Sequence, residues 1–421
     1  MRSTLRVSAA ALAIATLALT GCGRSDKAAT SADTTARPVA EGKATGTVTV
    51  WAMGTEGEKL GEFAKKFTTE NPDAKVEVTA IPWDSAHDKI STAIAAKQVP
   101  DVSLVGTTWM GEFASTGALD PTPSSIDPKS FFPGAWGTTM VGGTSFAVPW
   151  YVETRVLYVN TAVAQKAAVS PTPATWDELT AMAAGIQKAG GAESGITVQA
   201  GKTGAWQTLL PFAWQAGAKL TSDDGKKITI NTPEFVKALT YYQSLFAKGL
   251  APKELPDGTL ESDFNAGKIG SFVSGPWHIG ILNDAGNKDF TLAPLPKGEK
   301  NASFIGGSDL AVFKDAKNRD AAWKFVQWLS QPDTQAAWYS TIKDLPAVPA
   351  AWKLGTLATD PQLKVFGTQL ETAVAPPSIP NWEQIATVID TELEKVCKTG
   401  LDPQQAATAM QTQADAIGTG L

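Results

Sequence analysis

The folded part of the sequence begins with segments that alternate between strand and helix patterns. Residues 47–53 and 75–81 alternate apolar and polar side chains with the period of two typical of strands, and 102–105 form a third, short apolar run. Between these segments, residues 60–67 and 85–97 repeat apolar side chains at helical spacing. Strand and helix patterns in this order indicate layers packed on a largely parallel sheet. The sequence therefore predicts an α/β fold.

The length of the chain limits how this fold can be organised. The chain has 421 residues, of which 43% are hydrophobic and 19% are charged, an ordinary balance for a globular protein. A chain of this size exceeds what one compact hydrophobic core usually accommodates, because cores stop growing at about 250–300 residues and longer chains divide. We therefore expect two lobes.

The N-terminus has the pattern of an export signal. Two early arginines precede an apolar run over 7–19, which is shorter than the roughly 20 residues that a membrane-spanning helix needs. The run ends in Leu-Thr-Gly-Cys at 19–22, which resembles the bacterial lipobox, whose cysteine is acylated and becomes the new N-terminus. We therefore expect a lipoprotein signal peptide over 1–21 and lipidation of Cys22. Such a protein is secreted and anchored by lipid at the outer face of the cell membrane.

The residues after Cys22 lack the side chains that a core requires. Between 23 and 46 only Val39 is a sizeable apolar residue, and the rest is mainly Ser, Thr, Ala, Lys and Asp. We therefore expect a flexible tether over 22–46. The other cysteine, Cys397, has no partner for an intrachain disulfide once Cys22 is lipidated, and we expect it on a helix as a half-buried residue.

Charge and histidine content argue against several functions. The formal net charge is −6, and loss of the two arginines of the signal peptide gives −6 − 2 = −8. An acidic domain gives no electrostatic reason to bind nucleic acid. His87 and His278 are the only histidines and do not stand at the spacing of metal ligands, so we expect neither a metal site nor a cofactor.

Tryptophan is unusually abundant, with 14 residues against 5 tyrosines. An indole that lines a cleft offers a flat apolar face and one N–H donor. Sugar rings have a complementary shape, because an apolar C–H face is surrounded by hydroxyl groups. Any single tryptophan can equally well be a core residue, so the count alone does not assign a ligand.

Four segments, in order along the chain, resemble the extracellular sugar-binding proteins of bacterial ABC importers, the maltose-binding-like group. One contains Pro100-Asp101-Val102, and another contains Pro149-Trp150-Tyr151 followed by Glu153-Thr154-Arg155. The chain departs from the group at Glu153, where many members have aspartate. The four segments cover 95–102, 148–160, 264–277 and 320–330.

The resemblance implies a two-lobed, periplasmic-binding-protein-like fold with a ligand cleft between the lobes. We expect lobe one over 47–152 with 306–345, and lobe two over 153–305 with 346–421. Crossings between the lobes are expected near 150–160, 302–307 and 345–350. Proteins of this kind close like a hinge on a ligand that favours the closed state.

The resemblance also implies the function and the partners. We expect a solute-binding component that is not an enzyme and that binds a di- or oligosaccharide. It would act as a monomer and deliver the sugar to two permease subunits, which work with a cytoplasmic ATPase. The ligand contacts should be aromatic faces, carboxylate acceptors, an arginine and backbone N–H groups near glycines. We assign them to Glu56, Trp83, Trp109, Tyr151, Glu153, Arg155, Trp206, Trp277, Gly306, Gly307 and Trp382.

Other functions stay open at this point. A secreted glycoside-acting enzyme would need two carboxylates roughly 5–10 Å apart, and no motif pairs Glu56 with Glu153. The same fold could take glycerol phosphate, a polyamine or iron, but the sequence shows no basic cradle, no acidic cluster and few tyrosine or histidine ligands. A surface interaction protein without a transported solute is the remaining alternative.

Overall fold

The computed structural model of the chain describes residues 34–201, 204–256 and 258–421. The signal peptide expected over 1–21 and the lipidation site Cys22 lie outside the described residues. Among the described residues, no helix combines the length and the apolar composition needed to span a bilayer.

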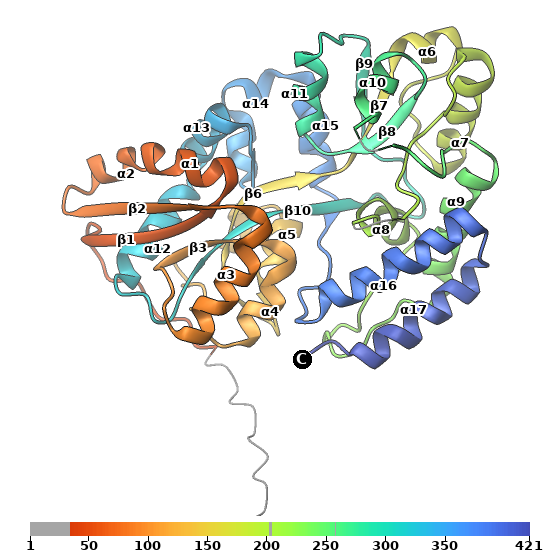
Figure 1. Ribbon diagram of the computed structural model, residues 1–421. Helices are drawn as coiled ribbons and strands as arrows, with labels where there is room; N and C mark the ends of the chain where they lie inside the picture. Colours follow the sequence, from red (N-terminus) through yellow and green to blue (C-terminus); the bar gives the residue numbers. More distant parts are fainter. Residues whose placement is uncertain (1–33, 202–203, 257) are drawn as a thin grey trace, which may run out of the picture. The chain divides into compact units, whose positions relative to one another are not determined.

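One large sheet organises the first part of the fold, which we call lobe one (Figure 1). Its strands are β1 (Gly46–Met53), β2 (Ala74–Ile81), β3 (Val102–Gly106), β6 (Val148–Thr154), β10 (Ser303–Val312), β11 (Leu345–Pro346) and β12 (Ala373–Val374). They lie in the order β11-β6-β10-β3-β1-β2, and β12 pairs with the beginning of β10. β1 is parallel to β2 and β3, whereas β10 is antiparallel to β3 and β6.

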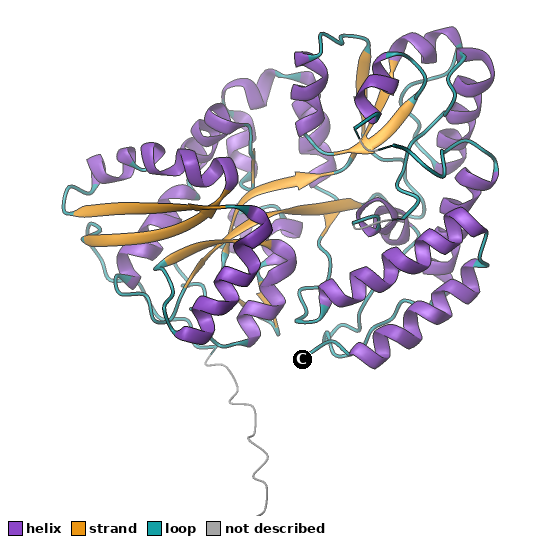
Figure 2. Cartoon of the chain, in the orientation of Figure 1, coloured by secondary structure: helices purple, strands orange, loops and turns teal. Residues whose placement is uncertain are grey.

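Helices cover this sheet (Figure 2) and also pack on one another through aromatic side chains. Phe63 packs edge-on against Trp338 with ring centroids 4.9 Å apart, and Phe67 packs in the same way against Phe325 at 5.1 Å. The elements are α1 (Gly54–Phe63), α2 (Lys65–Glu70), α3 (Trp83–Ala96), η1 (Thr107–Trp109), α4 (Met110–Ser115), η2 (Pro128–Ser130), α5 (Pro133–Thr138), a hairpin of β4 (Met140–Val141) and β5 (Thr144–Ser145), α12 (Arg319–Leu329), α13 (Pro332–Ile342) and η4 (Pro349–Lys353).

A small antiparallel sheet organises the second part of the fold, which we call lobe two. The fully buried strand β7 (Val156–Asn160) lies between β8 (Ser271–Ser274) and β9 (Phe290–Ala293). α15 contacts strands of both sheets. The surrounding elements are α6 (Thr161–Lys166), α7 (Trp176–Gly185), η3 (Ile186–Gly190), α8 (Trp206–Gln215), α9 (Pro233–Ala247), α10 (Leu260–Asn265), α11 (Trp277–Asp284), α14 (Gly355–Thr359), α15 (Pro361–Leu370), α16 (Trp382–Glu394), η5 (Lys395–Thr399) and α17 (Pro403–Ile417).

The chain passes from one sheet to the other at Arg155. β6 ends at Thr154 in the large sheet, and β7 begins with the next residue but one in the small sheet. This change of sheet falls within 150–160, where a crossing between the lobes was expected. Near 345–350, where another crossing was expected, β11 pairs with β6 and the Ala347 carbonyl accepts a hydrogen bond from Phe132 N, so these residues belong to the large sheet.

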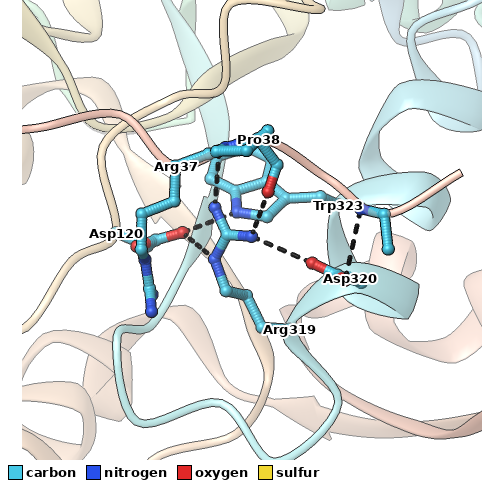
Figure 3. Close-up of polar contacts among 7 residues, drawn as sticks. Arg37, Pro38, Asp120, Arg319, Asp320 and Trp323 are labelled. Carbon is cyan, nitrogen blue, oxygen red and sulfur yellow. Dashed lines mark hydrogen bonds and ion pairs between the residues drawn. The ribbon is translucent and has the colours of Figure 1, made fainter.

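Part of the N-terminal segment is held against lobe one (Figure 3). The buried Asp120 carboxylate accepts hydrogen bonds from Arg37 Nη2 at 2.7 Å, Arg319 Nε at 2.6 Å and Trp323 Nε1 at 2.8 Å. Arg319 Nη2 also donates to the backbone carbonyl of Arg37 at 2.9 Å. Within the described part of the expected tether, the chain is thus bound to α12 from Arg37 onward.

A second buried carboxyl group lies inside lobe one, on β10. Asp309 is 1% exposed, and Thr138 Oγ1 lies 3.0 Å from both of its oxygens. The same hydroxyl donates to the Ala135 carbonyl at 2.7 Å. A hydroxyl has one proton, so a protonated Asp309 is the donor that completes this arrangement. Burial raises the pKa of Asp309 to about 8, which agrees with a neutral side chain.

Candidate functional site

Three predicted site residues come together at one edge of the large sheet. Glu56 follows β1, Trp83 opens α3 directly after β2, and Trp109 follows β3. These strands are parallel, so their carboxyl ends meet at the same edge, where ligands of α/β proteins usually bind. The Trp83 and Trp109 rings lie 5.8 Å apart at 60°, and Trp83 is 38% exposed. Lobe one thus offers an indole face beside a carboxylate.

Glycine at position 54 allows this grouping. Gly54 has φ of 53°, and a Cβ there would lie 3.1 Å from the Trp83 ring and 3.4 Å from Glu56 Oε2. A side chain would therefore be strained by its backbone conformation and would press on both groups. Behind them, burial and the charges of Glu56 and Asp344 raise the pKa of Tyr151 well above its usual value, and Ser308 Oγ donates to the Tyr151 hydroxyl at 3.0 Å.

Arg155 dominates the crossing between the sheets. It is 6% exposed, and its guanidinium lies 4.9 Å from the Trp277 ring and 5.1 Å from the Phe304 ring. Nη2 donates to Gln207 Oε1, and Nη1 lies 3.3 Å from Glu153 Oε2. These two cation–π contacts restrain the guanidinium. Two of the predicted residues, Arg155 and Glu153, therefore form an ion pair at the crossing.

Trp277 is the exposed ring of lobe two. It begins α11 directly after Gly275-Pro276 and is 42% exposed. A Cβ at Gly275 would lie 2.1 Å from the Trp277 ring, so glycine is required for the indole to fold over this turn. One face of the indole contacts Arg155, and the exposed part of the ring is available to a ligand.

A cavity of about 490 Å³ opens beside Trp277 in lobe two. Thr197, Gln207 at the start of α8 and Lys398 in η5 line it together with Arg155 and His278. His278 Nδ1 lies 2.8 Å from Ser274 Oγ and its Nε2 lies 2.9 Å from Glu261 Oε1, while burial lowers the His278 pKa. Apolar walls with a few fixed polar groups are typical of a small-molecule site.

Trp206 and Trp382 are buried rather than facing this cavity. They are 4% and 1% exposed and pack edge-to-face at 5.3 Å. Trp206 also packs on Phe304 at 5.4 Å, and Phe304 contacts Arg155, which contacts Trp277. In this structure neither ring offers a face to a ligand. Both belong to a row of side chains that contact one another in succession, which we call the aromatic column. Its members are Trp382, Trp206, Phe304, the guanidinium of Arg155, and Trp277.

The two predicted glycines of β10 are explained by strand packing. Gly306 pairs with Glu153 and Gly307 pairs with Val152 across to β6. Gly307 has φ of 122°, and a Cβ there would lie 2.3 Å from the Tyr151 carbonyl oxygen. The close approach of the two strands therefore already requires glycine at this position.

The match to a known family covers most of the chain. Residues 52–336 match the model of the bacterial extracellular solute-binding protein. The chain belongs to this family.

Members of the solute-binding protein family with solved structures or curated names are similar over nearly the whole chain. The structure of the sugar-binding protein MalE from Xanthomonas citri is 34% identical, with a TM-score of 0.83, covering 88% of this chain and 97% of that one. The diacetylchitobiose-binding protein DasA of Streptomyces coelicolor is 28% identical over 88% of this chain and 90% of its own length. The maltotriose-binding protein of Pyrococcus abyssi is 26% identical over 86% and 79%.

This solute-binding protein has a two-lobed α/β fold, as the sequence predicted, and the proteins that it resembles carry the names of binding proteins. Among the described residues, no three His, Cys, Asp or Glu side chains gather as metal ligands would. Sequence reasoning missed Thr197, Gln207 and Phe304. Each lies in an ordinary local pattern and reaches the site only through tertiary contacts, so no local signal distinguishes it.

Proposed function

We propose that this protein is the solute-binding component of a carbohydrate ABC importer and binds a di- or oligosaccharide between its lobes. The observation that carries the proposal is the pair of exposed indoles. Trp83 begins α3 just after β2 of lobe one, Trp277 begins α11 just after β8 of lobe two, and both residues are more than one-third exposed. An exposed indole offers a flat apolar face and one N–H donor, which suits the apolar face and the hydroxyl rim of a sugar ring.

The polar groups beside the two rings suit sugar hydroxyls. In lobe one the Glu56 carboxylate is an acceptor, Tyr151 lies close to it in the middle of β6, and Trp109 follows β3. In lobe two Arg155 is a donor and Glu153 an acceptor at the crossing. Aromatic faces with a few fixed donors and acceptors fit neutral polyols. The sugar-binding names of the similar proteins support the same ligand class.

The proposal includes the location and the partners. A lipid on Cys22 holds the protein at the outer face of the cell membrane, and the chain acts as a monomer. It presents the sugar to two permease subunits, which work with a cytoplasmic ATPase. The protein binds its ligand without changing it chemically, so a chromogenic glycoside should stay intact in its presence.

The first experiment measures sugar binding directly. The chain without its signal peptide and lipid is titrated with maltose, maltotriose and N,N′-diacetylchitobiose while tryptophan emission and the thermal midpoint are followed. A sugar at 100 times its Kd should add about 2.7 kcal/mol to the free energy of unfolding and raise the midpoint. If no sugar shifts either signal at millimolar concentration, the carbohydrate assignment fails.

A further inference from the structure

Two buried polar atoms of the lobe-two cavity make no hydrogen bond to the described residues. They are Arg155 Nη1 and Thr197 Oγ1. Arg155 Nη1 lies within 3.3 Å of Glu153 Oε2, as an ion pair whose geometry is not that of a hydrogen bond. Buried donors and acceptors are nearly always paired in folded proteins, because an unpaired one costs free energy. A ligand that fits this cavity should therefore supply hydrogen-bond partners for these two atoms.

Both atoms are held in place by the protein around them. The guanidinium of Arg155 is fixed between Trp277 and Phe304 and by its bond to Gln207. The backbone of Thr197 lies along β8, because its N–H donates to the Ser271 carbonyl at 2.8 Å. The guanidinium therefore needs no reorientation on binding, and the backbone that carries the Thr197 hydroxyl is already fixed.

The charges that line the cavity already have partners. Lys398 Nζ lies 2.6 Å from Glu254 and 2.8 Å from Glu394, and Arg155 is paired with Glu153. His278 is neutral at ordinary pH, because burial lowers its pKa. An anionic group that paired with Lys398 or Arg155 would therefore have to displace a carboxylate that is already in place, and Lys253 Nζ already donates to the Lys398 carbonyl at 2.9 Å.

We propose that the lobe-two cavity binds one neutral sugar unit stacked on Trp277, with its hydroxyl oxygens hydrogen-bonded to Arg155 Nη1 and Thr197 Oγ1. Arg155 can only donate, so it requires an acceptor oxygen, whereas the threonine hydroxyl can donate or accept. This inference rests on the proposed function and assigns two residues that determine its specificity.

The hydroxyl of Thr197 is tested with two variants of similar size. Titration calorimetry uses whichever of maltose, maltotriose and N,N′-diacetylchitobiose binds the wild type most tightly. Thr197→Val should weaken binding about threefold to tenfold, and Thr197→Ser should stay within about twofold, because serine keeps the hydroxyl. The thermal midpoint of the ligand-free Thr197→Val protein should not fall, because the methyl group replaces a hydroxyl that bonds to no described residue.

The guanidinium is tested with a charge-retaining variant and a control outside the cavity. Arg155→Lys should weaken binding of the same sugar more than tenfold, because lysine loses the fork and the stacking. Lys248→Met, which removes an exposed charge of lobe two that does not line the cavity, should stay within about twofold. The preference of the cavity for a neutral sugar is tested with D-glucose and D-glucuronate as competitors. Glucose should displace the bound sugar at the lower concentration.

The outcomes separate this inference from the proposed function. If the wild type binds no sugar of the panel, both are overturned. If the wild type binds and Thr197→Val and Arg155→Lys keep its affinity, only the inference is overturned. A marked fall in the thermal midpoint of Thr197→Val would show that the hydroxyl has a structural role. Glucuronate that competes as well as glucose would overturn the preference for a neutral sugar.

Discussion

The two walls of the proposed site are built in different ways. In lobe one the site residues follow parallel strands, so Glu56, Trp83 and Trp109 meet at one sheet edge by topology alone. In lobe two the sheet is antiparallel, and the wall consists of Trp277, Arg155 and loops that come from distant parts of the chain. The lobe-one wall can therefore be located from the rule that the carboxyl ends of parallel strands lie at one sheet edge. The lobe-two wall depends on tertiary packing between distant segments.

The two lobes also differ in how they accommodate a buried carboxyl group. Asp309 in lobe one has one hydroxyl partner, and burial raises its pKa to about 8. Asp390 in lobe two accepts from the backbone N–H groups of Gly204 and Trp206, both at 2.7 Å, and its pKa rises only to about 6, mainly through burial. Asp390 thereby fixes the loop that leads into α8.

The largest expected effect is the pH dependence of stability that Asp309 imposes. Its pKa is higher in the folded protein than in the unfolded chain, so its contribution is favourable below about pH 4 and is lost as pH rises toward about 8. Asp309→Asn keeps a neutral donor for Thr138 and should remove this loss. The measurement is urea unfolding of both proteins at pH 4 and pH 8. The free energy of unfolding of the variant, minus that of the wild type, should be larger at pH 8 than at pH 4 by on the order of 3 kcal/mol.

The matched variant in lobe two should behave in the opposite way. Asp390→Asn replaces a two-oxygen acceptor with a group that has one carbonyl, so one of the two backbone N–H groups loses its partner. We expect a loss of roughly 1–3 kcal/mol at pH 8. A stabilised Asp390→Asn or a pH-independent Asp309→Asn would contradict the contrast between the two acids.

Removal of the Trp277 indole tests whether the lobe-two wall contributes to sugar binding. Trp277→Ala should weaken sugar binding by about 2 kcal/mol, roughly thirtyfold, because the exposed indole is the main apolar contact of that wall. Ile281→Ala on the same helix, also exposed, serves as the control and should leave affinity unchanged in calorimetry. Equal affinities of Trp277→Ala and the wild type would remove lobe two from the site.

The corresponding change in lobe one should have a smaller effect. Trp83→Ala should cost about 1 kcal/mol of binding, roughly fivefold, because Trp109 remains next to it and offers a second face. Trp83→Phe should recover most of this loss in the same titration. A loss larger than that of Trp277→Ala would reverse the ranking of the two walls.

The smallest effect concerns the N-terminal segment. Arg37 is half-exposed and Arg319 also pairs with Asp120, so Arg37→Ala should lower the free energy of unfolding by only about 0.5 kcal/mol. Sugar affinity should not change, because the segment lies on α12 and not at the strand ends. Urea unfolding and calorimetry of this variant provide both values. An altered affinity would show that the segment communicates with the site.

The sequence was sufficient for the fold class and for the grouping of Glu56, Trp83 and Trp109 at one edge of the large sheet. Strand–helix alternation predicts parallel strands, and residues that follow such strands can be ranked without coordinates, as Trp83 and Trp109 show. Trp206 and Trp382 show the limit of this reasoning. Their glycine-rich and proline-framed loops look exposed, but both rings turn inward onto Phe304, a contact between distant segments that no local pattern encodes. Thr197 was missed for the same reason.

The aromatic column has a consequence for how the specificity of this protein can evolve. Each ring of the column is braced by the next, from the interior of lobe two out to Trp277. A substitution at any member disturbs its neighbours, so adaptation to a new sugar at that wall demands several coordinated replacements. Trp83 has one ring partner, Trp109, which in turn packs on the buried Phe113. A change of ligand preference at the lobe-one wall should therefore involve fewer coupled residues than one at the lobe-two wall.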